Sequence, residues 1–372
     1  MNCKKLTTMV LAAMIGFGSA GMAPVSEAAT RAELAQITVN QKGSDFKYWN
    51  EKSVPFQKLK SYVKDVTNPG SKNFIPVEDR IAVFDLDGTL VGETTPCYFE
   101  WMMYLERALN DKSFTPSPED REYAEEVKQT IEEVGIPNPK PERTRNMPKD
   151  MDRREAISQE SVFSGMTMPE YEQFVKNFME TKAEGMTNLK RGEAFYLPMV
   201  EVVSYLHANK FKIFIVSGTD RQALRVLTDG VLPVDKDNII GTDIFYEASN
   251  QNGADGLDYL YKHDDEVIRG EFILKNVKMN KVVNIVREIG KQPVLAFGNS
   301  SGDSSMFNYT ISNNKYKSLA FALLCDDLER ELGCMEKADK MRESCEKYGW
   351  IPVSMRDDFK TIYGNNVTRA VK

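Results

Sequence analysis

Histidine is almost absent from this chain of 372 residues, which contains only His207 and His263. Ser-His-Asp hydrolases, and phosphatases with a histidine nucleophile, would have to use one of these two residues, and neither lies in a recognisable nucleophile motif. Clusters of basic residues are also missing, and the formal net charge is -7. The sequence therefore has no electrostatic footprint for nucleic acid or for an anionic membrane, and small molecules are the expected partners.

Cysteine is scarce as well, with five residues in the chain. Cys3 precedes an apolar run, so it is not placed like a lipoprotein cysteine, and no Cys-x-x-Cys pair supports a zinc site. Three cysteines lie in the C-terminal fifth of the chain. Cys334 could pair with Cys345 or with Cys325, and their number alone does not fix the connectivity.

The N-terminus has the pattern of a secretory signal. Lys4 and Lys5 precede an apolar run from Leu6 to Ala23, and Ser26-Glu27-Ala28 supplies small residues for cleavage. We predict a signal peptide over residues 1–28 and export to the periplasm or the exterior, with an uncleaved membrane anchor as the alternative. No later hydrophobic run is long enough to cross a bilayer, so no stable membrane insertion is expected after cleavage.

Several short apolar runs without alternation indicate strands that are buried on both faces of a parallel sheet. The strongest are Ile81–Phe84, Phe211–Val216 and Pro293–Phe297, and 318–324 and 351–354 are further candidates. Amphipathic helical patterns separate them, including one over 282–289 that ends at Gly290. This alternation predicts an α/β, doubly wound parallel sheet, in which ligands bind at the carboxyl ends of the strands.

Between Val91 and about Lys190 the strand patterns give way to a long, charged, helix-prone stretch. Thr167-Met168-Pro169-Glu170 is a capping box that should open a helix running through Met179. A further helix is expected around Pro55 to Val66. The predicted organisation is a signal peptide (1–28), an N-terminal helical region (29–79), a catalytic core (80–92 and 191–372) and an inserted helical cap (93–190).

Polar residues follow three of the predicted strands, and the first set is Asp85-Leu86-Asp87-Gly88-Thr89. Two carboxylates two residues apart at a strand end suit a covalent nucleophile, Asp85, and an acid/base partner, Asp87. Asp-x-Asp pairs are common in ordinary turns. The catalytic assignment of this pair therefore depends on Gly88 and Thr89 and on the motifs that follow.

The later motifs supply what phosphoryl transfer needs besides a nucleophile. Ser217, followed by Gly218, offers a hydroxyl and helix N-terminal N–H groups to an anion. Lys281 is placed to neutralise a phosphate, although Lys275 and Lys278 compete for that role. Asp85, the main-chain carbonyl of Asp87 and an oxygen from the 299–303 loop, which contains Asn299 and Asp303, would complete a site for Mg²⁺. Each of these residues taken alone would more often be a cap, a surface lysine or a loop former.

In their order and spacing, these motifs resemble those of the haloacid dehalogenase superfamily, and the resemblance covers about residues 80 to 363. The helical stretch after the first motif and Ile240-Gly241-Thr242 resemble its phosphoserine phosphatase-like branch, in an exported bacterial subgroup. The resemblance implies a Rossmann-like core, an aspartyl-phosphate intermediate on Asp85 and hydrolysis of a small phosphorylated substrate with Mg²⁺. Because Asp87 is present, the resemblance favours phosphomonoester hydrolysis over dehalogenation or phosphonate cleavage.

Two positions depart from that family pattern. Asn299 stands where an aspartate is usual, which removes one negative charge from the expected metal site. Glu93, the candidate for substrate binding, lies one residue earlier than the glutamate with which phosphoserine phosphatases hold the amino group of their substrate. Two alternatives therefore stay open: a phosphotransferase that uses the same intermediate, and a non-catalytic binding protein on this fold.

Overall fold

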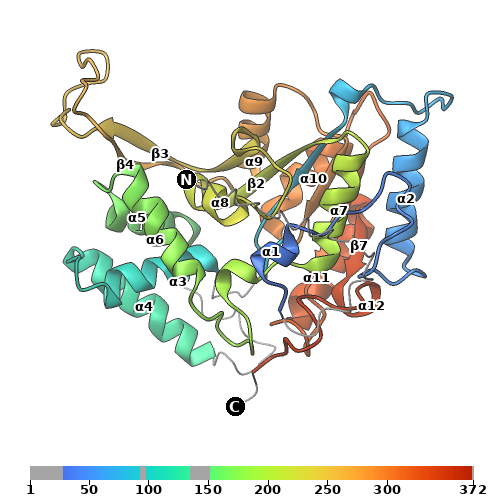
Figure 1. Cartoon of the computed structure of the whole chain (residues 1–372), viewed down its shortest axis with the longest axis horizontal. Helices are drawn as coiled ribbons and strands as arrows, with labels where there is room; N and C mark the ends of the chain where they lie inside the picture. Colours follow the sequence, from blue (N-terminus) through green and yellow to red (C-terminus); the bar gives the residue numbers. More distant parts are fainter. Residues whose placement is uncertain (1–27, 93–97, 135–150, 371–372) are drawn as a thin grey trace, which may run out of the picture.

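The predicted strands assemble into one seven-stranded sheet in the order β4-β3-β2-β1-β5-β6-β7 (Figure 1). The computed structural model describes residues 28–92, 98–134 and 151–370. Every neighbouring pair of strands is parallel except β3 and β4, so the expected doubly wound α/β class is confirmed. The strands are β1 (Ile81–Phe84), β2 (Lys212–Asp220), β3 (Ile239–Ala248), β4 (Val267–Leu274), β5 (Leu295–Gly298), β6 (Leu319–Leu324) and β7 (Ile351–Ser354).

Strand β1 lies at the centre of the parallel part of the sheet, between β2 and β5. All four of its residues are buried. Ala82 and Phe84 belong to one hydrophobic cluster, whereas Ile81 and Val83 belong to the other. Because both faces of the strand are covered, hydrophobic residues are required at every position, which explains the missing alternation in the sequence.

Helices flank the sheet, and those predicted from amphipathic patterns are present. The predicted helix at 282–289 is observed as α9, continued by a π-helical turn that ends at Gly290 with φ 68°. The core helices are α7 (Leu197–Ala208), α8 (Arg221–Thr228), α9 (Met279–Asn284), η5 (Ile285–Ile289), η6 (Ser301–Asp303), α10 (Ser304–Ile311), α11 (Met335–Tyr348) and α12 (Met355–Asp358). The N-terminal region contributes α1 (Arg31–Leu34) and α2 (Val54–Thr67), the latter over the expected range and ending at Asn68.

The described elements between β1 and the core helix α7 are helices joined by turns and loops, and we call the part from α3 to α6 the insertion. It comprises α3 (Phe99–Leu105), the π-helical turn η2 (Glu106–Asn110), α4 (Pro118–Val134), α5 (Met151–Phe163) and α6 (Met168–Met179). The predicted capping box at Thr167 and Glu170 opens α6. These helices gather below β3 and β4 on one side of the molecule, away from α2 (Figure 1).

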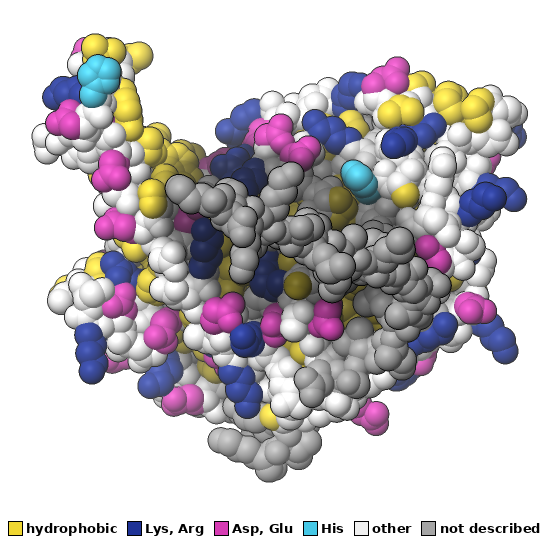
Figure 2. All heavy atoms as spheres, in the orientation of Figure 1, with side chains coloured by type: hydrophobic (Ala, Val, Ile, Leu, Met, Phe, Trp, Pro, Cys, Tyr) yellow, Lys and Arg dark blue, Asp and Glu magenta, His cyan; other side chains and the backbone are white. Residues whose placement is uncertain are grey.

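The antiparallel pair β3 and β4 was not predicted as strands. The two strands form an arm that projects from the sheet, joined by the loop 249–266 (Figure 1). Large hydrophobic side chains lie exposed along it, among them Phe245, Leu257, Leu260 and Tyr261 (Figure 2). Glycine and charged residues here interrupt apolar groups of only two or three residues, so neither a period of two nor a long apolar run marks the strands.

The C-terminal cysteines Cys325, Cys334 and Cys345 are buried thiols, so neither of the pairings considered from the sequence is present. The Cys325 Sγ donates a hydrogen bond to the Cys334 carbonyl at 3.4 Å. Residues 1–27 lie outside the described residues, and the predicted signal peptide with them. Among the helices that are described, none has both the length and the apolar character needed to cross a bilayer.

A buried ion pair joins the insertion to the sheet. Arg269 of β4 has no exposed side-chain surface and contacts Glu160 of α5 and, at 3.1 Å, Asp220 at the end of β2. The Tyr171 ring of α6 covers its guanidinium at 3.7 Å. Asp220 also accepts the Ala223 N–H and so caps α8. One cation thus connects α5, α6, β2 and β4.

We predict that Arg269→Ala lowers the free energy of unfolding by about 3–5 kcal/mol, because it leaves the carboxylates of Glu160 and Asp220 buried without their cation. Urea unfolding followed by circular dichroism measures the change. Lys190→Ala, which removes an exposed ion pair with Glu180, should cost no more than about 1 kcal/mol. Similar losses in the two variants would contradict the role given to Arg269.

Candidate functional site

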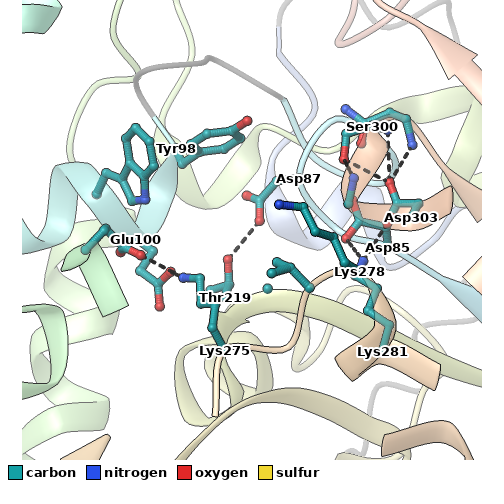
Figure 3. A pocket seen from close by; sticks show the side chains of 16 residues that line it. Asp85, Asp87, Tyr98, Glu100, Thr219, Lys275, Lys278, Lys281, Ser300 and Asp303 are labelled. Atoms are coloured by element: carbon teal, nitrogen blue, oxygen red, sulfur yellow. Dashed lines mark hydrogen bonds and ion pairs between the residues drawn. The ribbon is translucent and has the colours of Figure 1, made fainter. Parts of the chain in front are cut away.

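A pocket opens at the carboxyl ends of β1, β2 and β5, where the three polar motifs meet (Figure 3). The neighbouring insertion helices α3 and α5 supply its opposite wall. Its cavity volume is about 140 Å³. The lining residues are Asp85, Asp87, Tyr98, Glu100, Trp101, Glu155, Gly218, Thr219, Lys275, Val277, Lys278, Lys281, Asn299, Ser300, Gly302 and Asp303.

Lys281 connects the first motif to the last. Its Nζ donates to Asp85 Oδ1 and to Asp303 Oδ1, each at 2.6 Å, and all three side chains are at least nine-tenths buried. Burial opposes the charged form of Lys281, yet Asp303 and Asp85 together raise its pKa. Lys281 therefore contacts Asp85, whereas Lys275 contacts Glu100 and Glu155.

The second oxygen of Asp303 organises the loop after β5. Asp303 Oδ2 accepts the backbone N–H groups of Asn299 and Ser300, both at 3.0 Å, and the Ser300 hydroxyl at 3.2 Å. Gly298 makes room for this carboxylate, because a Cβ at that position would lie 2.6 Å from Asp303 Cγ. Both oxygens of Asp303 thus accept hydrogen bonds from protein donors.

Asp85 lies directly after β1, and its backbone N–H donates to the Phe297 carbonyl of β5 at 2.9 Å. The Thr89 hydroxyl is 3.4 Å from Asp85 Oδ2. Burial raises the pKa of Asp85 to about 8, with the charge of Asp303 acting in the same direction and that of Lys281 opposing it. A further positive charge beside Asp85 would favour the carboxylate form.

Asp87 reaches the pocket from the turn after β1, and Gly88 in that turn has φ 77°. The Thr219 hydroxyl donates to Asp87 Oδ2 at 2.8 Å, an interaction visible in Figure 3. Thr219 was not among the predicted site residues, although it lies in the polar sequence at the end of β2. The sequence does show a hydroxyl residue two positions after Ser217, which could have suggested a site residue. Only the fold shows that this hydroxyl reaches Asp87.

Ser217 does not line the pocket, whereas the next two residues, Gly218 and Thr219, do. It is fully buried, and its Oγ accepts the Thr219 N–H at 3.2 Å. Asn276 holds this strand end by donating to the Ser217 carbonyl at 3.0 Å. Glu93, the remaining candidate, lies outside the described residues.

The wall facing the motifs was not predicted from the sequence. It consists of the aromatic pair Tyr98 and Trp101, with ring centroids 5.0 Å apart, and of Lys275 between two glutamates. Lys275 Nζ donates to Glu100 Oε2 at 2.9 Å and to Glu155 Oε2 at 2.7 Å. No local sequence pattern pairs these residues, because 175 and 120 positions separate Lys275 from the two glutamates.

The pocket contains oxygen donors that suit a hard divalent cation. Asp85, Asp87 and Asp303 bring three carboxylates close to one buried ammonium, that of Lys281. Within the described ranges, no cluster of three or more His, Cys, Asp or Glu side chains could by itself hold a metal ion. The groups that could hold such an ion are Asp85, the Asn299 amide oxygen and the main-chain carbonyl of Asp87, all ligands of the type that Mg²⁺ prefers.

Comparison with protein families gives a match over residues 80–308 to the haloacid dehalogenase-like hydrolase model. A search of curated protein sequences gave no match.

Comparison with solved structures gives alignments at low sequence identity, of which three follow. A protein of unknown function from Anaerococcus prevotii aligns with a TM-score of 0.49 and 14% identity, over 84% of this chain and 95% of its own. One from Bordetella pertussis aligns with a TM-score of 0.45 and 16% identity, over 74% and 97%. Cytosolic 5'-nucleotidase IIIB bound to cytidine aligns with a TM-score of 0.41 and 10% identity, over 80% and 84%.

The close approach at Gly298 gives a test of the loop geometry. Gly298→Ala places a methyl group against Asp303, and we expect the free energy of unfolding to fall by about 1–3 kcal/mol. Gly256→Ala is the matched control, because a Cβ there meets nothing within 4 Å and should change stability by less than about 0.5 kcal/mol. Thermal or urea unfolding compares the two, and equal stabilities would show that Asp303 does not need this glycine.

Proposed function

This chain belongs to the haloacid dehalogenase-like hydrolase family, and on that premise we propose that it hydrolyses small phosphomonoesters with Asp85 as the nucleophile. The observation that carries the proposal is the buried arrangement in which Lys281 contacts both Asp85 and Asp303 at 2.6 Å. Phosphoryl transfer needs a nucleophile and an acid/base group close together. This pocket contains a buried carboxylate held by a lysine and a second carboxylate beside it.

In the first step, an Asp85 oxygen attacks phosphorus and the P–O bond to the alcohol breaks. Asp87 gives its proton to the departing oxygen, and Thr219 keeps that carboxyl group in position through the 2.8 Å hydrogen bond. In the second step, Asp87 removes a proton from water, and the resulting hydroxide attacks the aspartyl phosphate. The P–O bond to Asp85 breaks, which releases phosphate and restores the carboxylate.

The positive charge around the phosphoryl oxygens comes in part from Lys281, and the Gly218 and Ser300 segments line the same region. We propose that Asp85, Asn299 and the carbonyl of Asp87 also hold Mg²⁺, which when bound supplies electrostatic stabilisation of the phosphoryl oxygens. Asp303 then serves to hold Lys281 and the loop rather than the ion. Export of the enzyme stays the prediction made from residues 1–28.

The test of the nucleophile is turnover of a phosphomonoester panel in the presence of Mg²⁺, with 4-nitrophenyl phosphate as the general substrate. We expect Asp85→Asn to lower kcat by at least about a thousandfold, because the amide is a poor nucleophile. Asp258→Asn, an exposed exchange on the arm loop, is the control and should keep full activity. Activity that survives Asp85→Asn would overturn the assignment, and a folded wild-type protein without activity on any substrate would favour a binding function.

The metal proposal is tested by binding rather than by turnover. Asn299→Asp adds a formal negative charge to the donor set, and we expect it to tighten Mg²⁺ binding by about tenfold or more, because affinity follows ligand charge. Titration calorimetry measures the dissociation constant for wild type, for this variant and for the exposed control Asn365→Asp. An unchanged constant in Asn299→Asp would remove Asn299 from the ligand set.

A further inference from the structure

The far wall of the pocket contains a carboxylate oxygen that no described residue satisfies. Glu155 of α5 is 1% exposed, and its Oε2 accepts from Lys275 at 2.7 Å. Its Oε1 is buried and has no hydrogen-bond partner in the described part of the chain. Burying such an oxygen without a donor costs roughly 1–3 kcal/mol, so the site is expected to receive a donor from elsewhere.

The two charged neighbours of Glu155, Glu100 and Lys275, do not donate to this oxygen. Glu100 is fully engaged, because its Oε1 accepts the Asp220 N–H at 2.7 Å and its Oε2 accepts from Lys275 at 2.9 Å. Lys275 is the only cation in contact with these two carboxylates among the described residues, so the group carries one surplus negative charge when both are ionised. Burial and the charge of Glu100 raise the pKa of Glu155 to about 8, and Lys275 only partly opposes them.

Two aromatic side chains complete the same wall. Trp101 and Tyr98 line the pocket as an edge-to-face pair, with an interplanar angle of 76°. Figure 3 shows Tyr98 and Glu100 on the side of the pocket opposite Asp85 and Lys281, with Asp87 between them. A leaving group whose oxygen is protonated by Asp87 would therefore extend toward the aromatic pair and the glutamates.

We propose that this wall is the leaving-group subsite and that it selects aminoalkyl phosphates, whose ammonium group donates to Glu155 Oε1. This inference rests on the proposed phosphatase function. An ammonium satisfies the orphaned oxygen and neutralises the surplus charge, while its methylene groups pack on the aromatic pair, where a cation is also favoured. Leaving groups that carry a carboxylate and no ammonium are disfavoured, because their negative charge would face Glu100 and Glu155.

The experiment compares three small substrates of similar size: 2-aminoethyl, 2-hydroxyethyl and carboxymethyl phosphate. For the wild-type enzyme we expect kcat/KM to be at least tenfold higher for the aminoethyl ester than for the hydroxyethyl ester, and lowest for the carboxymethyl ester. Glu155→Gln should reduce the aminoethyl-to-hydroxyethyl ratio by at least tenfold. The exposed Glu125→Gln on α4 should leave both rates and their ratio unchanged.

The outcomes separate this inference from the proposed function. Turnover of 4-nitrophenyl phosphate together with a wild-type preference for the hydroxyethyl or carboxymethyl ester would overturn the subsite while leaving the phosphatase function intact. No turnover of any ester by folded protein would overturn the function itself. The wild-type comparison needs no variant, so it decides the matter even if Glu155→Gln does not fold. Where it does fold, an unchanged ratio would remove Glu155 from the role.

Discussion

The bridge from Lys281 to Asp85 and Asp303 is the interaction on which the rest of the site depends. It joins the end of β1, the start of α9 and the loop after β5, which are far apart in the sequence. Two carboxylates and an ammonium are removed from water together, and such a group persists only if each charge keeps its partners. The hydrogen bonds that Asp303 accepts from its own loop meet this requirement. The same bonds fix where Asn299 enters the pocket.

The parallel sheet, and the edge of it at which Asp85 and Asp303 meet, could be predicted from the sequence for the same physical reason. Strands buried on both faces must be hydrophobic at every position, so Ile81–Phe84 is recognisable without any knowledge of its neighbours. The polar residues that follow such strands must then meet at one edge of the sheet. The order of Asp85, Ser217, Lys281 and Asp303 along the chain was therefore enough to predict most of the residues on the catalytic side of the site.

The opposite wall could not be predicted, because it depends on how the insertion packs against the core. Glu100, Glu155 and Lys275 come from α3, α5 and the segment after β4, and nothing local in the sequence pairs them. The arm of β3 and β4 was missed for a related reason, since its strands are held by each other and by the insertion rather than by a hydrophobic run. Thr219 is an intermediate case: its motif was visible, but its contact with Asp87 requires the fold.

Two buried ionic groups, one at Arg269 and one at Lys275, connect the insertion to the core. Comparing them shows why the pocket wall at Lys275 is suited to selecting a substrate and does not serve stability alone. Arg269 has a carboxylate on each side and an aromatic ring over its guanidinium, and it lies behind the pocket, where it fixes the insertion to β2 and β4. Lys275 has the same two-carboxylate environment, and each group leaves one carboxylate oxygen without a hydrogen-bond partner among the described residues, Glu160 Oε1 at Arg269 and Glu155 Oε1 at Lys275. Of these two glutamates, only Glu155 lines the pocket. A buried ion pair adds little net stability over well-packed hydrophobic residues of the same volume. The pair at Arg269 is explained by the register that it imposes on four elements. The group at Lys275 likewise joins α3, α5 and the segment after β4, but it also lines the pocket, where a bound ligand can supply the missing donor to Glu155.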